Sequence, residues 1–315
     1  MKWFLALGYL LISSSVFATL NNGIKAYERQ EYDQALAEFK TLASVGNAEA
    51  RYYLGLMQKN GYAMPQDPGR ALGWFKKAAS QGYAPAYREL GKMYLSGDGV
   101  KADIEAAIDA LTDAAEKGDE PAQMELALLY NSGEKIEKNP AEAQRWFELA
   151  AAQGNVQAQY QLANALYEGS GAGKNVEQAL KWYQQAAAAG HVDAQYTLAY
   201  LYMDGQAIPQ DYPRAFGLFE QAAQAGNRNA QYMLGYMLDQ GMGVAKNSKV
   251  AFDWYLKAAQ QGYDEAQLIV GYMYFTGKGA TKNAALAEDW LGKAVAQGNA
   301  KAQKLLDEMH RAAKK

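Results

Sequence analysis

The stretch from Gly169 to Asn175 reads GSGAGKN and resembles a phosphate-binding loop more than any other segment of this chain. In such loops the backbone N–H groups surround the phosphate oxygens and a Lys side chain reaches the terminal phosphates. The full motif requires Gly at position 168 and Ser or Thr at position 175, where this chain has Glu168 and Asn175. It also requires a preceding strand, whereas the residues before Gly169 have a helical pattern. We therefore expect no nucleotide site and no cofactor.

Other residues that perform catalysis or bind metals are few and scattered. The chain has no Cys and only two His, His191 and His310, so we expect no thiolate nucleophile and no histidine metal cluster. The carboxylate pairs Glu288-Asp289 and Asp307-Glu308 fall on outer faces of predicted helices, where solvated charge is the simpler interpretation. The sequence predicts no catalytic residue, no metal site and no enzymatic activity.

Tyrosine is the residue type best placed to recognise a partner. Tyr200, Tyr236 and Tyr272 recur at a constant spacing, and each offers a large rigid surface with a polar tip. The formal net charge of −3 gives no basic surface of the kind that nucleic acids or anionic lipids require. Recognition of a protein or of sugar rings fits these residues better than recognition of nucleic acid.

The spacing of these tyrosines is the period of the whole chain. A Gly recurs at the same interval eight times, at Gly46, Gly82, Gly118, Gly154, Gly190, Gly226, Gly262 and Gly298. A period this regular indicates stacked copies of one helix–loop–helix unit, without a single central core.

Each unit contains the signals of two helices. After the leading Gly, apolar residues at the fourth, eighth and eleventh positions form one helical stripe, and a second Gly ends that helix. An Asp or Asn then precedes the second helix and can accept a hydrogen bond from a free first-turn N–H group. These predicted caps are Asp67, Asp103, Asn139, Asn175, Asp211, Asn247 and Asn283.

The two ends of the chain differ from the repeats. Residues 1–18 have a positive start, an apolar run and a small residue at Ala18, which is typical of a secretory signal peptide. The apolar run is too short to span a bilayer, so we expect cleavage, no membrane insertion afterwards, and a periplasmic or secreted protein. Residues 19–45 are predicted to form a capping helical hairpin, residues 46–297 seven repeats, and residues 298–315 a capping helix with a basic tail.

The repeated unit A-x-A-x-Y-x-L-G-x-M-Y-x-x-G-x-G-V…D…A-x-x-W-Y-x-K-A-A-x-Q-G resembles the Sel1-like repeat, a relative of the tetratricopeptide repeat. Residues 84–118 match its start and residues 230–262 match it throughout. The resemblance implies an all-α, right-handed α/α superhelical solenoid that acts as an adaptor or binding scaffold, often exported in bacteria. Some exported members are associated with penicillin binding and β-lactam hydrolysis, but those have a disulfide in each repeat and this chain has no Cys.

The side chains at positions six, ten and thirteen after the leading Gly lie opposite the core stripe of the first helix. By analogy with tetratricopeptide proteins, this face lines the concave groove of the solenoid. A face without a role should be polar, whereas in the C-terminal repeats it is largely aromatic. The predicted partner-binding residues are Tyr167, Tyr196, Tyr200, Met203, Tyr232, Tyr236, Leu268, Tyr272 and Phe275. For the tyrosines at position six, packing between repeats remains the alternative interpretation.

The sequence therefore predicts an exported, non-enzymatic scaffold that binds a protein or peptide in its concave groove. The first alternative is a glycan-binding protein whose tyrosines stack on peptidoglycan or exopolysaccharide. A weaker alternative is a hydrolase that acts on cell-wall or β-lactam substrates.

Overall fold

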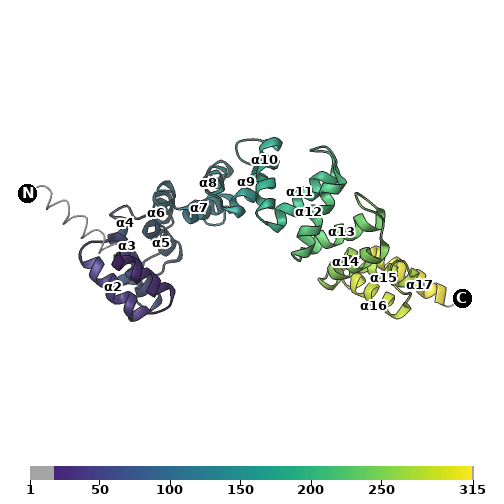
Figure 1. The fold of residues 1–315 in the computed structure, drawn as a ribbon, viewed down its shortest axis with the longest axis horizontal. Coiled ribbons are helices and arrows are strands. Elements are labelled where there is room, and N and C mark those ends of the chain that lie inside the picture. Colours follow the sequence, from purple (N-terminus) through teal and green to yellow (C-terminus); the bar gives the residue numbers. More distant parts are fainter. Residues whose placement is uncertain (1–17, 314–315) are drawn as a thin grey trace, which may run out of the picture. The chain divides into compact units, whose positions relative to one another are not determined.

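The computed structural model describes residues 18–313, and every regular element in this range is an α-helix (Figure 1). The predicted all-α fold is therefore confirmed. The predicted signal peptide lies outside the described residues apart from Ala18, and so do the last two lysines of the predicted basic tail.

The chain divides into two compact units, and the division falls within one helix. The N-terminal unit comprises residues 1–158 and 170–172, and the C-terminal unit comprises residues 159–169 and 173–315. The helices of the first unit are residues 18–28, α2 (Tyr32–Ser44), α3 (Ala48–Asn60), α4 (Pro68–Ala79), α5 (Ala84–Ser96), α6 (Ile104–Glu116), α7 (Glu120–Ser132) and α8 (Pro140–Ala152). The division lies in α9 (Val156–Glu168).

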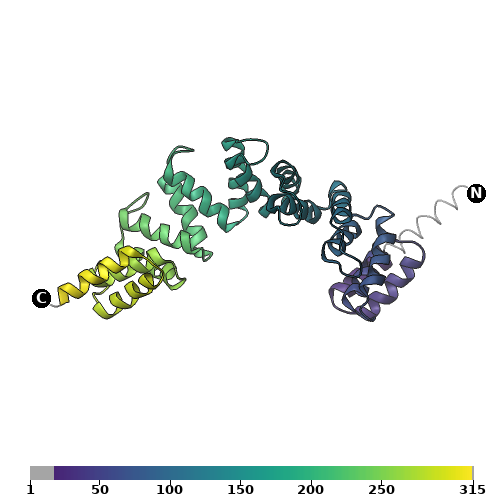
Figure 2. The same cartoon turned by 180° about the vertical axis from the view of Figure 1, so that it is seen from behind.

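The C-terminal unit continues with the same alternation of first and second helices. Its helices are α10 (Val176–Ala188), α11 (Val192–Asp204), α12 (Tyr212–Gln224), α13 (Arg228–Gln240), α14 (Ser248–Gln260), α15 (Asp264–Thr276), α16 (Ala284–Ala296) and α17 (Ala300–Ala313). From α10 onward each helix packs on the next one in sequence, and Figure 2 shows this succession from behind as the green-to-yellow part of the chain. Helices adjacent in sequence are thus adjacent in space, as in other repeat proteins.

The predicted caps of the second helices are all present. Asn247 is representative, because its Oδ1 accepts a hydrogen bond from the Val250 N–H group at 3.1 Å. Several first helices have a cap that we did not predict, in the position directly after the leading Gly. Asn227 is one example, since its Oδ1 accepts from the Ala230 N–H group at 2.9 Å. Both helices of most repeats therefore begin at a residue fixed by its own side chain.

Small residues allow the two helices of a repeat to approach closely. A Cβ atom on Gly235 of α13 would lie 2.9 Å from the Tyr255 ring of α14, and one on Gly271 of α15 would lie 2.7 Å from Leu291 of α16. Both partner side chains are buried in the core.

Buried glutamines connect successive repeats, a feature that we did not predict. Gln267 is 5% exposed, donates from Nε2 to the Ala259 carbonyl at 3.2 Å, and accepts from Gln297 Nε2 at 2.8 Å. The first bond reaches the second helix of the preceding repeat, and the second reaches the end of the second helix of its own repeat. The same pattern links Gln123 with Ala115 and Gln153, and Gln231 with Ala223 and Gln261.

The loop after α15 is attached to the start of α14. Lys278 Nζ lies 2.6 Å from Asp239 Oδ2, and Ser248 Oγ donates to Asp239 Oδ1 at 2.8 Å. Burial acts to raise the pKa of Asp239, but the hydrogen bonds from Lys278 and Ser248 outweigh it, so the pKa is lowered. Gly279 has φ of 76°, and a Cβ there would lie 2.2 Å from the Ser248 carbonyl oxygen. Only Gly fits this contact between repeats.

Candidate functional site: the predicted binding face of the first helices

Three tyrosines at equivalent positions of α11, α13 and α15 remain exposed. Tyr200 is 46% exposed, Tyr236 38% and Tyr272 42%. They belong to successive first helices within the C-terminal unit, so one side chain follows another at each repeat. We call these three residues the tyrosine row. Their exposure distinguishes them from the other tyrosines of the predicted binding face.

The tyrosines four residues earlier on these helices pack within the structure. The Tyr196 ring meets Phe219 of α12 edge-on, with centroids 5.7 Å apart. Tyr232 lies 5.5 Å from the Tyr255 ring of α14 and 5.0 Å from Tyr263, the residue before α15. Burial raises the pKa of both Tyr196 and Tyr232. Both residues therefore have a role in packing, although each side chain remains partly exposed to solvent.

The remaining predicted binding residues are less accessible than the tyrosine row. Leu268 is 8% exposed and belongs to the core around α15, α16 and α17, which corrects the prediction that it offers surface to a partner. Met203, Phe275 and Tyr167 are half-buried. The Lys282 ammonium lies 5.9 Å from the Phe275 ring centre and that of Lys174 lies 5.0 Å from the Tyr167 ring, so cations already cover part of both rings.

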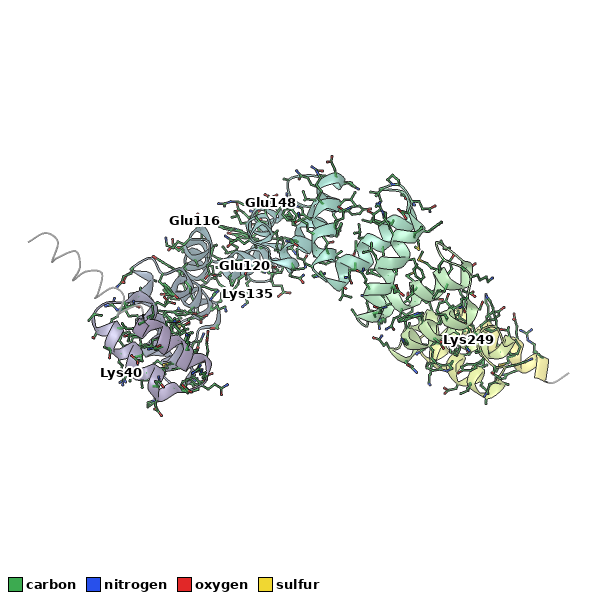
Figure 3. The ribbon with its side chains drawn as sticks, viewed as in Figure 1. Lys40, Glu116, Glu120, Lys135, Glu148 and Lys249 are labelled. Atoms are coloured by element: carbon green, nitrogen blue, oxygen red, sulfur yellow. The ribbon has the colours of Figure 1, made fainter. Side chains whose placement is uncertain are left out.

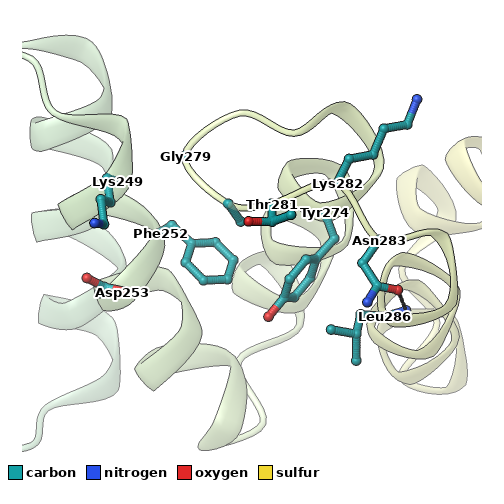
Figure 4. Close-up of a pocket in the computed structure, with 10 residues that line it drawn as sticks. Lys249, Phe252, Asp253, Tyr274, Gly279, Thr281, Lys282, Asn283 and Leu286 are labelled. Atoms are coloured by element: carbon teal, nitrogen blue, oxygen red, sulfur yellow. Dashed lines mark hydrogen bonds between the residues drawn. The ribbon is translucent and has the colours of Figure 1, made fainter.

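A pocket of about 430 Å³ lies between α14, the loop after α15, and α16 (Figure 4), and its lining includes none of the predicted binding residues. Phe252 and Tyr274 form its apolar part, edge-to-face with centroids 5.1 Å apart. In the N-terminal unit, Ile108 and Tyr130 line a pocket of about 380 Å³ at the same repeat positions. Because the pocket recurs at equivalent positions, it results from the repeat geometry, in which each loop covers the second helix of the preceding repeat.

The glycine-rich loop that resembled a phosphate site serves the fold. The Ala172 N–H group donates to Gln144 Oε1 at 2.8 Å, and Asn175 Oδ1 accepts from the Gln178 N–H group at 3.0 Å as the cap of α10. His191 also has a structural position, because its Nδ1 accepts from the Ala194 N–H group at 3.2 Å and its ring stacks on Tyr160 at 4.6 Å. Burial lowers the pKa of His191.

Two further properties concern the part of the chain that the structure describes. Among residues 18–313, none of the helices combines the length and the apolarity that crossing a bilayer demands. In the same range, His, Asp and Glu side chains do not gather in the groups of three that could hold a metal ion.

Comparison with known proteins identifies the repeat. The Sel1 repeat model matches residues 48–83, 84–119, 120–155, 156–191, 192–227, 228–263 and 264–299. The crystal structure of c5321, a protective antigen of uropathogenic Escherichia coli strains with an SLR fold, has a TM-score of 0.87 and 35% identity, covering 98% of this chain and 67% of that chain. A Sel1 repeat protein from Oxalobacter formigenes has a TM-score of 0.69 and 30% identity, covering 98% and 90% of the two chains. No curated protein matches the chain. The seven predicted repeats are confirmed.

Proposed function

The chain belongs to the Sel1 repeat family, and we propose that it is an exported, non-enzymatic scaffold that binds a protein or peptide through the tyrosine row. The observation that carries this proposal is the difference between two sets of tyrosines on the same helices. Tyr196 and Tyr232 are half-buried and pack on rings of neighbouring helices, whereas Tyr200 and Tyr236 are 46% and 38% exposed. Packing therefore does not account for the second set.

The chemistry of the row favours a protein partner. Tyr presents a large amphipathic ring at low entropic cost, and such residues supply much of the binding energy in protein interfaces. Because the three positions share one register, a partner that lies along the unit meets a ring at each repeat. Export is proposed from the signal-peptide pattern of residues 1–18, which places the binding event in the periplasm or outside the cell.

The proposal is tested with purified protein of residues 19–315 and its variant Tyr200→Ser, Tyr236→Ser, Tyr272→Ser. A partner captured from envelope extract is identified, purified and titrated against both forms, and we expect the variant to lose binding. The control is Tyr202→Ser with Tyr274→Ser, which removes half-buried tyrosines from α11 and α15 at a different helix position. Equal loss of binding in the control would show that the row has no special role.

A folding measurement accompanies the binding assay. The three side chains are 38 to 46% exposed, so we expect each substitution to cost about 0.5 kcal/mol and the melting temperature of the triple variant to fall by about 3 to 6 °C. A fall of more than about 10 °C would show that the three tyrosines belong to the core and that lost binding reflects lost structure.

Glycan binding is the second candidate, since exposed tyrosine rings can also stack on sugar rings. Sedimentation with insoluble peptidoglycan distinguishes the two: retention of the wild type but not of the row variant, with no protein captured, would favour the glycan. Turnover of a β-lactam by pure protein would instead support the hydrolase.

A further inference from the structure

The N-terminal hairpin, formed by residues 18–28 and α2, shares a hydrophobic core with the first repeat. Phe39 of α2 and Met57 of α3 are fully buried in this core. Four half-buried tyrosines pack against it, two from the hairpin and two from the first repeat: Tyr27, Tyr32, Tyr53 and Tyr62. Figure 3 shows the side chains at this end of the chain, where the exposed Lys40 of α2 is labelled. Because the chain has no Cys, no disulfide fastens the hairpin to the repeats.

Tyr32 and Tyr62 are the one tyrosine pair within residues 18–313 whose rings stack face to face. Their centroids are 4.2 Å apart and their planes are inclined by 10°. In the other tyrosine pairs with rings in contact, the planes are inclined by 53° to 73° and the centroids lie 5.0 to 6.4 Å apart. Tyr27 meets both rings of the stack edge-on, at 5.7 and 6.1 Å. Tyr27 therefore supports the stack from the side without being part of it.

The hydroxyl groups of the two stacked rings lie at the same end of the stack. The pKa of Tyr32 is raised by burial and, further, by the charge of the Tyr62 hydroxyl and a hydrogen bond with it. In a stack whose two hydroxyls are neighbours, the ring carbons beside each hydroxyl also lie over one another. A head-to-tail stack would separate these carbons.

The backbone beside each stacked ring adopts a conformation that residues with a Cβ atom rarely take. Gln30, two residues before Tyr32, has φ of 63°, and Ala63, directly after Tyr62, has φ of 53°. Among the described residues these are the only two besides glycines with positive φ. The left-handed region is costly for such residues, so it persists only where surrounding contacts fix it. The Tyr62 N–H group, for example, donates to the Met57 carbonyl at 2.9 Å. The two strained turns are thus the ones that bring the stacked rings together.

Two phenols in this arrangement are positioned for oxidative coupling. Removal of one electron and the hydroxyl proton from each phenol gives two phenoxyl radicals, whose unpaired electrons lie partly on the ring carbons beside the oxygen. Face-to-face overlap brings two such carbons into the geometry for bonding, whereas edge-on rings offer no overlap. We propose that Tyr32 and Tyr62 form a modification site, at which a haem peroxidase that uses hydrogen peroxide joins them as dityrosine.

The reaction balances with hydrogen peroxide as the final oxidant. Each phenol gives up one electron and one proton, and the peroxide takes up both electrons and both protons to become two water molecules. The new bond joins the carbons ortho to the two hydroxyls. The hydrogen on each of these carbons then moves as a proton to the oxygen of its own ring, which restores both phenols. The product is a carbon–carbon bond between the hairpin and the first repeat.

Treatment of the purified, dilute chain with hydrogen peroxide and a small peroxidase-active haem peptide, which can reach half-buried rings, tests the site. We expect a monomeric product that is lighter by two hydrogen atoms and has dityrosine fluorescence, and peptide mapping should find Tyr32 linked to Tyr62. Tyr62→Phe keeps a ring for the stack but removes the hydroxyl that the radical requires, so it should lose this product. The matched control is Tyr27→Phe, at another half-buried ring of the cluster, which should keep it.

Two outcomes would overturn the proposal. One is the absence of a link between Tyr32 and Tyr62 in the treated wild type. The other is an equal yield of a link between Tyr27 and Tyr53, whose planes are inclined by 65°, because it would show that stacking does not direct the coupling. If Tyr62→Phe has lost its helical circular dichroism, Tyr32→Phe replaces it, with loss of the product again expected.

The cross-link should also fasten the hairpin to the first repeat. A bond between Tyr32 and Tyr62 closes a loop of about 30 residues, so the coupled protein should melt about 5 to 10 °C higher than the untreated one. Amide hydrogen exchange in residues 18–44 should become slower. Treated Tyr62→Phe should show neither change. Equal shifts in the treated wild type and in treated Tyr62→Phe would show that oxidation elsewhere is the cause, and the proposal would fail.

Discussion

Replacing Gly279 by Ala tests whether the loop of the last repeat is held by close contact with the repeat before it. The new Cβ would lie 2.2 Å from the Ser248 carbonyl oxygen and 2.7 Å from the Met273 methyl group. The Met273 side chain can move, but Ser248 is the first residue of α14 and its backbone cannot retreat without disturbing that helix. The contact therefore has to open, and the bond between Lys278 and Asp239 beside it should weaken.

The magnitude follows from two costs and one gain. Overpacking costs about 1 to 3 kcal/mol, and a left-handed backbone with a Cβ costs about 1 to 2 kcal/mol. The lower entropy of the unfolded chain returns about 0.4 to 1 kcal/mol. We expect a net loss of about 2 to 3 kcal/mol for Gly279→Ala, which lowers the melting transition of the C-terminal repeats by roughly 5 to 10 °C.

Gly292→Ala is the matched control, because Gly292 lies inside α16 and a Cβ there meets nothing within 4 Å. In a helix interior this change should stabilise by about 0.5 to 1 kcal/mol. Melting followed by circular dichroism, together with amide hydrogen exchange in α14 and α15, measures both variants. Equal shifts in the two, or wild-type melting of Gly279→Ala, would refute the reasoning.

Two other substitutions test polar groups that are buried or half-buried. Gln267→Met removes two hydrogen bonds from the interior and should lower the free energy of unfolding in denaturant by about 1 to 2 kcal/mol. The control is Gln303→Met at the equivalent exposed position of α17, which should change that free energy by less than about 0.5 kcal/mol. Glu125→Gln should raise the unfolding midpoint at neutral pH, because the pKa of Glu125 in the folded state is raised above 4.5 and its ionisation opposes folding. The gain should disappear as the pH falls through the raised pKa and below 4.5, so an unchanged difference between the two proteins in acid would contradict this assignment.

The repeats could be predicted because their signals are local. A Gly in the left-handed region and an Asp or Asn cap act on the residues beside them, so Asn247 and its equivalents were found without any knowledge of packing. The cap at His191 was missed because His is uncommon in that role, although its position directly after the leading Gly was a usable signal.

Burial on the predicted binding face could be predicted only in part, because it depends on neighbouring helices. Tyr196 and Tyr200 look alike in the sequence, but only the first has a ring from the following helix to pack on. Leu268 is covered by α16 and α17, whose approach no local rule indicates. The sequence prediction also missed the buried glutamines. A polar residue on a helix usually faces water, and it can be buried only where distant groups form hydrogen bonds with it.

The glutamine bonds have a consequence for how such a chain can change its length. Gln231 uses a carbonyl of the preceding repeat and an amide of its own, and Gln267 does the same one repeat later. Removing residues 228–263, one whole matched repeat, would bring Gln267 to the Ala223 carbonyl, which Gln231 uses now, and both bonds of Gln267 would be kept. A deletion that is not a whole number of repeats would shift this register and leave some of these glutamines unbonded. Evolution can therefore change the length of such a chain by whole repeats without breaking these buried bonds.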